Sequence, residues 1–535
     1  MPTEDAKRIY GIDLGTTYSC IAYVDEYGKP VVVNNAEGNS TTPSVVYFEG
    51  PENIVVGQTA KDVAEVNSDQ VVSTVKRVMG DANWIFEYNG HTYRPQHISS
   101  FILKKVVQDA QTNTGDVISE VVITCPAYFG VAEREATKQA GILAGLNVRY
   151  VIPEPTAAAI CYGINQTQEQ VILVFDLGGG TFDVTLIQVD SSNIRVICTG
   201  GDHRLGGRDW DEDIANWIAH QCINEHGGYI EDLTDNLATW QELINKAEKA
   251  KQALSNATKT IITQWHNGKR SAIELTRKTF EEITAHRLAQ TLTLTEELMQ
   301  IASQKGFIQI DKVILVGGST YMPQVINAVQ QRFPAIEVLQ YDPNQAVAKG
   351  AALMGFQCQI DDKFRKMTEQ LDSTQDQKEI LGLPSPSRVK KIHNVTSKSF
   401  GIVVVDELDA ECVVNLILAD TEVSCSVTKQ FGTSKPNQTG VELRCMENLE
   451  RNENSAVSLE HATEIGKTEL HFTKPLPKYS PVEITFSLSE DGLLTVRGKD
   501  LTTDQEVEAS FTSKALLTAE ELAEEVSHSK SLIIS

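Results

Sequence analysis

The stretch FDLGGGTFDV, residues 175–184, places an aspartate and three glycines at the end of a strongly apolar strand. Three consecutive glycines lose much conformational entropy on folding, so their presence indicates that the backbone at this turn has to be free of side chains. A second stretch, YGIDLGTTYSCIAYV at residues 10–24, repeats the order of apolar strand, Asp-Leu-Gly, small residues and second strand. The chain therefore carries an internal repeat in which Asp13 and Asp176 hold equivalent places.

Both repeats predict a tight β-hairpin with small side chains at its turn. Such a turn lets backbone N–H groups converge on one point, which makes a concavity that binds anions. Thr16, Thr17 and Thr181 add hydroxyl donors, and Asp13 and Asp176 offer the oxygen ligands that a hydrated Mg²⁺ ion prefers. Two such hairpins facing each other would hold a nucleotide polyphosphate from both sides. A single Asp-Leu-Gly is also a good turn sequence without function, but the duplication argues against that interpretation.

A third glycine motif lies in KVILVGGSTYMPQV, residues 312–325. Gly317 and Gly318 follow a predicted strand and precede a predicted helix, which permits the close approach of a flat ligand. A tight strand-to-helix turn without a ligand is the alternative. The sequence contains no Walker A lysine loop, G-x-G-x-x-G turn or kinase catalytic loop. The predicted nucleotide site is therefore of the duplicated-hairpin type.

Composition excludes several classes of function. The net charge of −25 argues against binding to nucleic acid or to an anionic membrane surface, since both need an excess of Lys and Arg. No apolar run approaches the roughly 20 residues that span a bilayer, and the N-terminus does not resemble a signal peptide. The nine cysteines include no C-x-x-C pair, which favours reduced thiols over a disulfide frame or a zinc site. We expect a cytoplasmic protein.

The pattern of elements divides the chain. Strand and helix signals alternate through residues 8–357, which predicts an α/β architecture, and one long helix is expected at 280–306. Polar residues follow, with Pro384 and Pro386 excluding a continuous helix, and short strands with turn residues then predict an all-β domain. Thr518 and Glu521 have capping-box spacing for one last helix. The expected units are an α/β domain at 1–358, a linker at 359–398, an all-β domain at 399–513 and a short helical segment at 514–535.

The order of motifs resembles the seventy-kilodalton heat-shock (DnaK-type) chaperone family. The resemblance is carried by GIDLGTTYS, VKRVMG, PAYF, EPTAAAI, FDLGGGTFDV, GDHRLGGRDWD, VGGST and DPNQAVAKGAA. It covers residues 8–357 densely and 399–517 more weakly, and the related actin and sugar-kinase superfamily shares the hairpins but not the whole series. The resemblance implies a duplicated actin-like (ribonuclease-H-like) ATPase domain of two lobes, followed by a β-sandwich that binds peptides. It also implies slow ATP hydrolysis with ATP or ADP and Mg²⁺ as cofactors, and a role in protein folding and the stress response.

The family's functional residues can be carried over where this sequence matches its motifs. Lys76 would reach the γ-phosphate and the attacking water, because an ammonium group neutralises charge that develops in phosphoryl transfer. The implied catalytic set is Lys76, Glu154, Asp176, Thr181 and Asp183, and Asp13 and Asp176 would hold Mg²⁺ through water. The phosphates would lie on Gly15, Thr16, Thr17, Tyr18, Gly178, Gly179 and Gly180. The adenosine would contact Glu248, Lys251, Ser255, Gly317, Gly318, Ser319, Tyr321 and Asn344.

Two further sets concern the β domain. Pro126 and Arg134 match the family's relay between the nucleotide state and the contact between domains. The peptide groove would be lined by Ile402, Val405, Phe431, Val441 and Leu443, with a place in the sandwich core as an equal alternative. After Ser510 the family continues into a helical lid, whereas this chain has only 25 more residues. We therefore expect no lid and fast peptide exchange.

Other departures affect the nucleotide and partner sites. Gln252 and Tyr321 stand where the family flanks adenine with two arginines, so we expect weaker adenine binding. Asn344 replaces a common aspartate, and Tyr150 replaces an arginine that receives J-domain partners. The sequence VKKIHNVTSKSFGI at 389–402 stands where the family has a leucine-rich linker. This difference puts the family's usual coupling between the two domains in doubt.

Two functions remain open at this point. The first is an ATP-dependent chaperone-like protein that transiently binds unfolded or extended segments, with a possible J-domain protein and nucleotide exchange factor as partners. The second is a nucleotide-switched co-chaperone or regulator whose β domain docks one specific protein. A metabolite kinase of the wider superfamily is disfavoured because it predicts no β domain.

Overall fold

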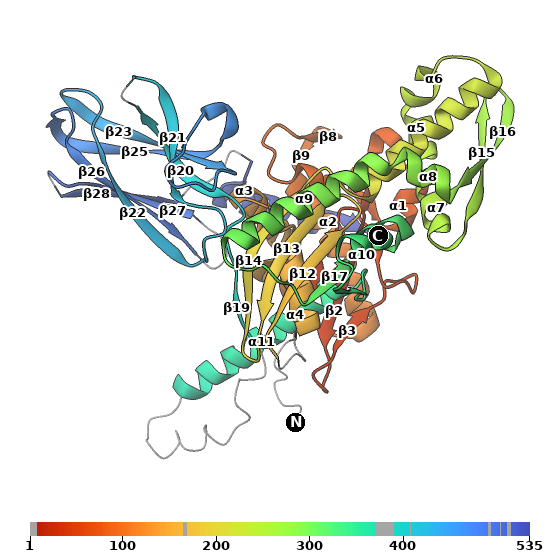
Figure 1. Ribbon diagram of the computed structural model, residues 1–535, viewed down its shortest axis with the longest axis horizontal. Helices are drawn as coiled ribbons and strands as arrows, with labels where there is room; N and C mark the ends of the chain where they lie inside the picture. Colours follow the sequence, from red (N-terminus) through yellow and green to blue (C-terminus); the bar gives the residue numbers. More distant parts are fainter. Residues whose placement is uncertain are drawn as a thin grey trace.

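The computed structural model describes residues 8–163, 168–369, 390–406, 408–489, 494–502, 504–510 and 515–535. Figure 1 shows two central α/β lobes, a β-sandwich at one end of the molecule, and at the other end a small group of helices with the β15–β16 hairpin. Within these ranges no helix is long and apolar enough to cross a membrane.

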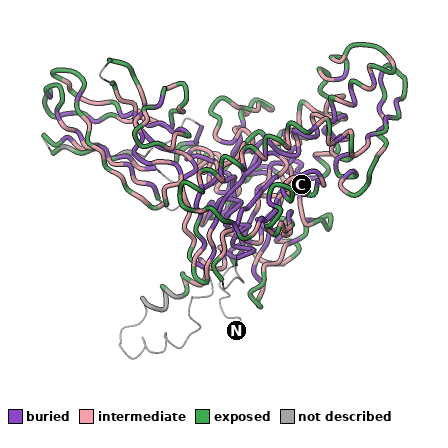
Figure 2. The backbone as a smooth tube through the Cα atoms, viewed as in Figure 1, coloured by how far each residue is buried: buried purple, intermediate pink, exposed green. Residues whose placement is uncertain are grey.

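Each lobe is built on a sheet of the same design. In lobe I, β1 (Ile9–Asp13) pairs antiparallel with β2 (Tyr18–Val24) and parallel with β10 (Glu120–Cys125), with β3 (Pro30–Val33) and β11 (Asn147–Pro153) outside them. The apolar runs of β1 and β10, which pair in parallel, are buried on both faces, as parallel strands under helices require (Figure 2).

Lobe II repeats the arrangement. Here β12 (Gln170–Leu177) pairs antiparallel with β13 (Phe182–Val189) and parallel with β17 (Lys312–Val316). β18 (Glu337–Gln340) lies beyond β17 at one edge of the sheet, and β14 (Asn193–Asp202) lies beyond β13 on the other side. Both predicted hairpins, β1–β2 and β12–β13, therefore lie at the same place in their sheets. The overall α/β class agrees with the sequence, and the actin-like assignment stays a prediction.

Two helices join the lobes. α4 (Glu154–Gly163) and α11 (Ala346–Glu369) pack together in a core that also contains residues of both central sheets. Their axes approach closely because small residues line the contact: a Cβ at Gly350 of α11 would lie 1.7 Å from the Ala157 carbonyl oxygen of α4. α11 also packs closely on β1, where a Cβ at Gly11 would lie 2.0 Å from the Ala352 nitrogen. The motifs EPTAAAI and AVAKGAA are thus explained by packing between the lobes.

The remaining elements of the lobes pack on these sheets or extend beyond them. In lobe I they are β4 (Thr42–Pro43), β5 (Val45–Phe48), β6 (Asn53–Val56), α1 (Gln58–Val63), η1 (Ser68–Gln70), β7 (Val71–Ser73), η2 (Val75–Val78), β8 (Phe86–Tyr88), β9 (His91–Tyr93), α2 (Pro95–Thr114) and α3 (Val131–Leu143). In lobe II they are α5 (Gly207–His226), α6 (Glu231–Thr234), α7 (Leu237–Asn256), β15 (Lys259–His266), β16 (Lys269–Thr276), α8 (Arg277–Ile283), α9 (Ala285–Gln304), η3 (Gly318–Tyr321) and α10 (Pro323–Arg332).

The single long helix expected at 280–306 is wrong. It is divided into α8 and α9 at Thr284, whose φ of −105° and ψ of 7° leave the helical region. The Thr284 hydroxyl donates to the Phe280 carbonyl and lies beside Gln324, so it takes part in capping the first helix and in a buried contact. Such local hydrogen bonding by threonine competes with helix continuation.

The β domain is a sandwich of two sheets. One has the order β24-β21-β20-β23-β25 and the other β22-β26-β27-β28. The strands are β20 (Ser399–Val405), β21 (Glu411–Ile417), β22 (Cys425–Gly432), β23 (Gln438–Asn448), β24 (Ala456–Val457), β25 (Thr463–Leu476), β26 (Pro481–Leu488), β27 (Leu494–Asp500) and β28 (Gln505–Ser510), with the short η5 helix (Leu459–His461) between β24 and β25.

The predicted linker is shorter than expected. α11 continues through Glu369, well inside the segment expected to be linker, and the strand β19 (Lys391–His393) pairs parallel with β14 of lobe II. Pro384 and Pro386 lie outside the described residues. The linker expectation at 359–369 and 391–393 is therefore corrected, because regular helix and strand hydrogen bonding extends into it from lobe II.

The C-terminal segment docks on lobe I. Residues 515–535, here called the C-terminal strap, comprise the predicted helix α13 (Ala519–Ser531) and a strand β29 (Ile533–Ile534) that pairs parallel with β6. Leu516 and Leu532 are buried in the lobe I core. The side chains of Gln96 and Gln139 bond the backbone of Ala515 and Leu517 at 2.8–3.0 Å. The strap is thus part of the ATPase half of the molecule.

Candidate nucleotide-binding site

A cavity of about 830 Å³ lies between the lobes. Its walls contain residues of both hairpins, η2, α7 and η3, so it gathers predicted residues that are far apart in sequence. The predicted site residues that line it are Asp13, Gly15, Thr16, Thr17, Tyr18, Lys76, Glu154, Asp176, Gly178, Gly179, Thr181, Glu248, Lys251, Ser255, Gly317, Gly318, Ser319, Tyr321 and Asn344.

The two hairpins face each other directly. A Cβ at Gly179 would lie 2.1 Å from the Thr17 hydroxyl oxygen, and a Cβ at Gly180 would lie 2.2 Å from the Thr16 methyl carbon. Gly206, which precedes α5, also packs on Gly180 with no room for a side chain. Glycines are therefore needed here for contact between the hairpins, in addition to the exposed backbone inferred from sequence.

The third glycine motif closes the same wall. Gly317 has φ +84°, and a Cβ there would lie 2.4 Å from the Leu177 carbonyl oxygen, so a side chain is excluded by both conformation and space. The Ser319 hydroxyl donates to the Gly178 carbonyl at 2.8 Å. The motif thus fixes η3 against the second hairpin, while Tyr321 lies more exposed at the margin.

Buried acidic residues surround Lys76 at the phosphate end. Lys76 is buried and pairs with Glu154, and burial opposes its charge, yet attraction from Glu154 and Asp13 leaves the pKa of Lys76 above its usual value. Burial raises the pKa of Asp13 to about 7, with repulsion from Glu154 adding to it. Burial and the same carboxylate raise the pKa of Asp176 and Asp183 well above their usual range.

This charge balance tests whether the site suits a metal. Four acids around one lysine would gain from an added divalent cation, and carboxylate oxygens are the ligands that Mg²⁺ prefers. Among the described residues no group of three or more His, Cys, Asp or Glu side chains is arranged to hold a metal by itself. The excess of carboxylates over cations suits an added Mg²⁺ ion, and coordination through water stays a prediction.

The residues predicted to contact adenosine lie partly on α7, which contacts α5. Lys251 on α7 bonds the Gly207 carbonyl at 2.6 Å and pairs with Asp211 at 2.7 Å, and both belong to α5. Ser255 follows one turn later on the same face and donates to the Lys251 carbonyl. Asn344 lies beside Gly318, where an added Cβ would come within 3.0 Å of its amide oxygen. The predicted adenosine residues are thus brought together.

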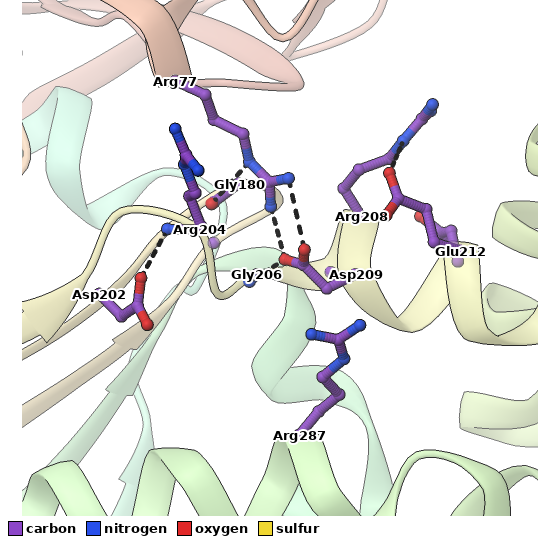
Figure 3. A network of polar contacts seen from close by, with 12 residues as sticks. Arg77, Gly180, Asp202, Arg204, Gly206, Arg208, Asp209, Glu212 and Arg287 are labelled. Atoms are coloured by element: carbon purple, nitrogen blue, oxygen red, sulfur yellow. Dashed lines mark hydrogen bonds and ion pairs between the residues drawn. The ribbon is translucent and has the colours of Figure 1, made fainter.

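Three cross-lobe partners escaped the sequence interpretation. Lys61 of α1 pairs with Glu248 of α7 at 2.5 Å and donates to the Tyr18 hydroxyl at 2.9 Å. Arg77 of η2 pairs with Asp209 of α5 at 2.5 Å and donates to the Gly180 carbonyl at 3.0 Å (Figure 3). Arg77 and Asp209 stand beside recognised residues in VKRVMG and GGRDWD, but nothing local marks Lys61.

The predicted relay residues lie between the cavity and the β domain. The Asp183 carboxylate accepts from the Ala127 amide at 2.8 Å, directly after Pro126. Arg134 donates to the Ala127 and Phe129 carbonyls, and Ser397, close to the sandwich, donates to the same Phe129 carbonyl at 3.3 Å. These hydrogen bonds therefore connect Asp183 of β13 with Ser397, two residues before the first strand of the sandwich.

The sandwich contacts both lobes. Lys398 lies between Glu447 of the sandwich and Glu133 of α3, and Val131 of α3 is part of the sandwich core. On the lobe II side, Asp420 pairs with Arg451 at 3.1 Å and accepts from the Thr199 amide of β14 at 3.3 Å.

The five predicted groove residues do not share one environment. Ile402 and Leu443 are buried in the sandwich core, with Phe431 and Val441 packed partly buried against it. Val405 is 46% exposed at the end of β20. In this conformation Ile402 and Leu443 are core residues of the sandwich and do not line a groove. The peptide groove itself stays a prediction.

A comparison with protein families gives one result. The family model described as Hsp70 protein matches residues 9–87 and 81–532. The matched region includes both lobes, the sandwich and most of the C-terminal strap.

Proposed function

Because this chain belongs to the Hsp70 family, whose members are ATP-dependent chaperones that use ATP or ADP with Mg²⁺, we propose that it hydrolyses ATP slowly between its lobes and transiently binds extended apolar segments of unfolded proteins. The observation that carries the proposal is the cavity in which both glycine hairpins, Lys76 and the α7 face meet.

The residues of the cavity have distinct proposed roles. Backbone N–H groups and the hydroxyls of Thr16, Thr17 and Thr181 bind the phosphate chain. Lys76, oriented by Glu154, stabilises negative charge on the transferred phosphoryl group. Asp13 and Asp176 would hold Mg²⁺, which would supply further neutralisation of the phosphate charge.

We further propose that the nucleotide state reaches the sandwich. The hydrogen bonds from Asp183 through Ala127, Phe129 and Ser397 support this route, as does the pairing of β19 with β14. The proposed units are the duplicated ATPase domain, the sandwich as substrate domain, and a connection between them around β19. A J-domain protein and a nucleotide exchange factor are proposed partners, and nine unpaired cysteines suit a reducing compartment such as the cytoplasm.

One observation favours the alternative, a regulator whose sandwich docks a specific protein. Ile402 and Leu443 are buried, so they offer no apolar surface to a peptide in this conformation. Under this alternative the nucleotide site acts as a switch and unfolded segments are not preferred.

The test measures dissociation of a fluorescent apolar peptide from the full chain, first with ADP and then with ATP. Lys76→Ala should bind nucleotide but lose hydrolysis by about 10²-fold or more, because a charge-stabilising group is removed. Lys278→Ala is the matched control, since Lys278 is highly exposed on α8. The full chain is required because the strap belongs to lobe I.

The outcomes separate the two functions. Faster peptide dissociation with ATP supports the chaperone. Equal dissociation with both nucleotides, or no peptide binding, together with intact hydrolysis, would favour the regulator. Absence of hydrolysis in the unmodified chain would contradict the ATPase.

A further inference from the structure

Four cations line the nucleotide cavity, and one differs from the rest. Lys61, Lys76 and Lys251 each pair with a carboxylate at 2.7 Å or less. In the part of the chain that the structure describes, the contact made by the Arg208 side chain is with Glu212, which its Nε reaches at 3.4 Å. Glu212 is itself 38% exposed at its side chain, so this contact is weak. Figure 3 shows the terminal nitrogens of Arg208 pointing away from Glu212.

The backbone of Arg208 is fixed on the second hairpin. Its amide donates to the Gly179 carbonyl at 2.7 Å, and the amide of Gly207 donates to the Gly178 carbonyl at 2.9 Å. One turn later on α5, Asp211 holds Lys251 of the adenosine end. Arg208 thus stands between the glycine turn and the α7 face, and its side chain is only 19% exposed.

The chemistry of this position suits phosphate. A guanidinium group with free terminal nitrogens presents parallel N–H donors that match two oxygens of a phosphate group, and such pairs are stronger than neutral hydrogen bonds. The cavity's other cations are already neutralised by carboxylates. Arg208 is therefore the lining cation best able to add a new charge contact without breaking an existing strong pair.

We propose that Arg208 binds the phosphate chain of the bound nucleotide. The inference rests on the proposed nucleotide-binding function and deepens it: affinity in this chain depends strongly on phosphate. This fits the base end, where Gln252 and Tyr321 line the cavity and offer no cation to the ring.

The test is calorimetric titration of the full chain with ADP and, separately, with adenosine. Arg208→Ala should weaken ADP binding about tenfold or more, the effect of one charged hydrogen-bonding partner, while adenosine affinity stays within about twofold. Arg208→Lys should retain part of the ADP affinity because it keeps the charge but loses the paired donors. Arg204→Ala is the control, because Arg204 lies on the same segment but is exposed and outside the cavity lining.

The comparison of ligands distinguishes the possible failures. If the unmodified chain binds ADP and Arg208→Ala binds it equally well, the inference is wrong and the proposed function stands. If Arg208→Ala weakens ADP and adenosine alike, the side chain supports the fold and the phosphate contact is refuted. If the unmodified chain binds neither ligand, the proposed function fails and this inference fails with it.

Discussion

At the scale of single residues, Lys61 and Glu248 hold the two lobes together at the nucleotide cavity. Both side chains line it, one from each lobe, and Tyr18 bonds both of them. Removing the lysine leaves Glu248 without its ion-pair partner and frees the lobes to separate. A partly buried charge that loses its partner is costly, so the closed arrangement should weaken.

We therefore expect Lys61→Ala to release ADP several-fold faster, measured by displacement of fluorescent ADP in stopped flow. Lys246→Ala is the matched control, since Lys246 pairs with Glu242 on the same helix and joins no lobes. An unchanged release rate in Lys61→Ala would show that this pair does not hold the nucleotide in place.

At the scale of elements, the C-terminal strap stabilises lobe I. Leu516 is buried in the lobe I core, and burying a charge there without a partner is strongly unfavourable. Leu516→Asp should lower the free energy of unfolding by about 3 kcal/mol or more, as measured by urea denaturation. Leu408→Asp, at a leucine 87% exposed in the sandwich, should change it by less than about 0.5 kcal/mol. Equal effects of the two variants would contradict the role of the strap.

The docking of α13 should depend on pH. Glu525 lies 3.4 Å from His97 of α2 and 3.5 Å from His91 of β9, and His528 stacks on His91. The His97 contact holds the pKa of Glu525 below its usual value, so its stabilising effect is full above the unfolded value and declines as pH falls. Burial lowers the pKa of His91, and repulsion from His528 and His97 adds to this effect, while attraction to Glu525 opposes it. As pH falls below about 6.5, His91 is therefore protonated more readily in the undocked state than in the docked one, which favours undocking.

Both shifts have the same sign, so acid should weaken the docked strap. Between pH 7.5 and 5.5 the change comes from His91, because the contribution of Glu525 declines only below its unfolded value of 4.5. Hydrogen exchange of α13 amides, corrected for intrinsic rates, should show less protection at pH 5.5 than at pH 7.5. His91→Phe should reduce this difference. Protection that is constant over this range would mean that the cluster does not control docking.

At the scale of the whole molecule, Asp420 helps to fix the sandwich on lobe II. Its side chain is 1% exposed, and it meets Arg451, Lys305 and the Thr199 amide. Asp420→Ala leaves the partly buried Arg451 and the backbone of β14 without this partner, and should favour separation of the sandwich. Small-angle scattering should then show a larger radius of gyration. Asp406→Ala is the control, since the Asp406 carboxylate bonds amides of its own turn. No change in Asp420→Ala would contradict this anchoring role.

Much of the site was predictable because its motifs depend on local geometry. The strand that ends in Asp-Leu-Gly predicts a hairpin wherever it occurs, and two copies predict a duplicated site. The positions of Lys61 and Arg208 in the cavity were not predictable, because both residues line it together with elements that are distant in sequence. Whether the domains are coupled despite the absence of a leucine run in the linker stays a question for experiment, and the pairing of β19 with β14 was not foreseen from the sequence. Strand pairing uses main-chain hydrogen bonds, which most sequences can supply.

The sequence by itself determined the α/β and all-β division and the glycine hairpins, because periodicity and turn chemistry act over short distances. The resemblance to a known family, and not local pattern, supplied Lys76, Glu154 and the predicted adenosine contacts, and about half of the residues that line the cavity were named in advance. The sequence also determined the C-terminal helix through the capping box of Thr518 and Glu521. Only the tertiary structure decided where that helix lies, which salt bridges join the lobes, and that Ile402 and Leu443 point into the sandwich core. The docking of that helix, the salt bridges between the lobes and the burial of these two side chains all depend on contacts between segments that are distant in sequence. No local pattern of residues encodes such contacts.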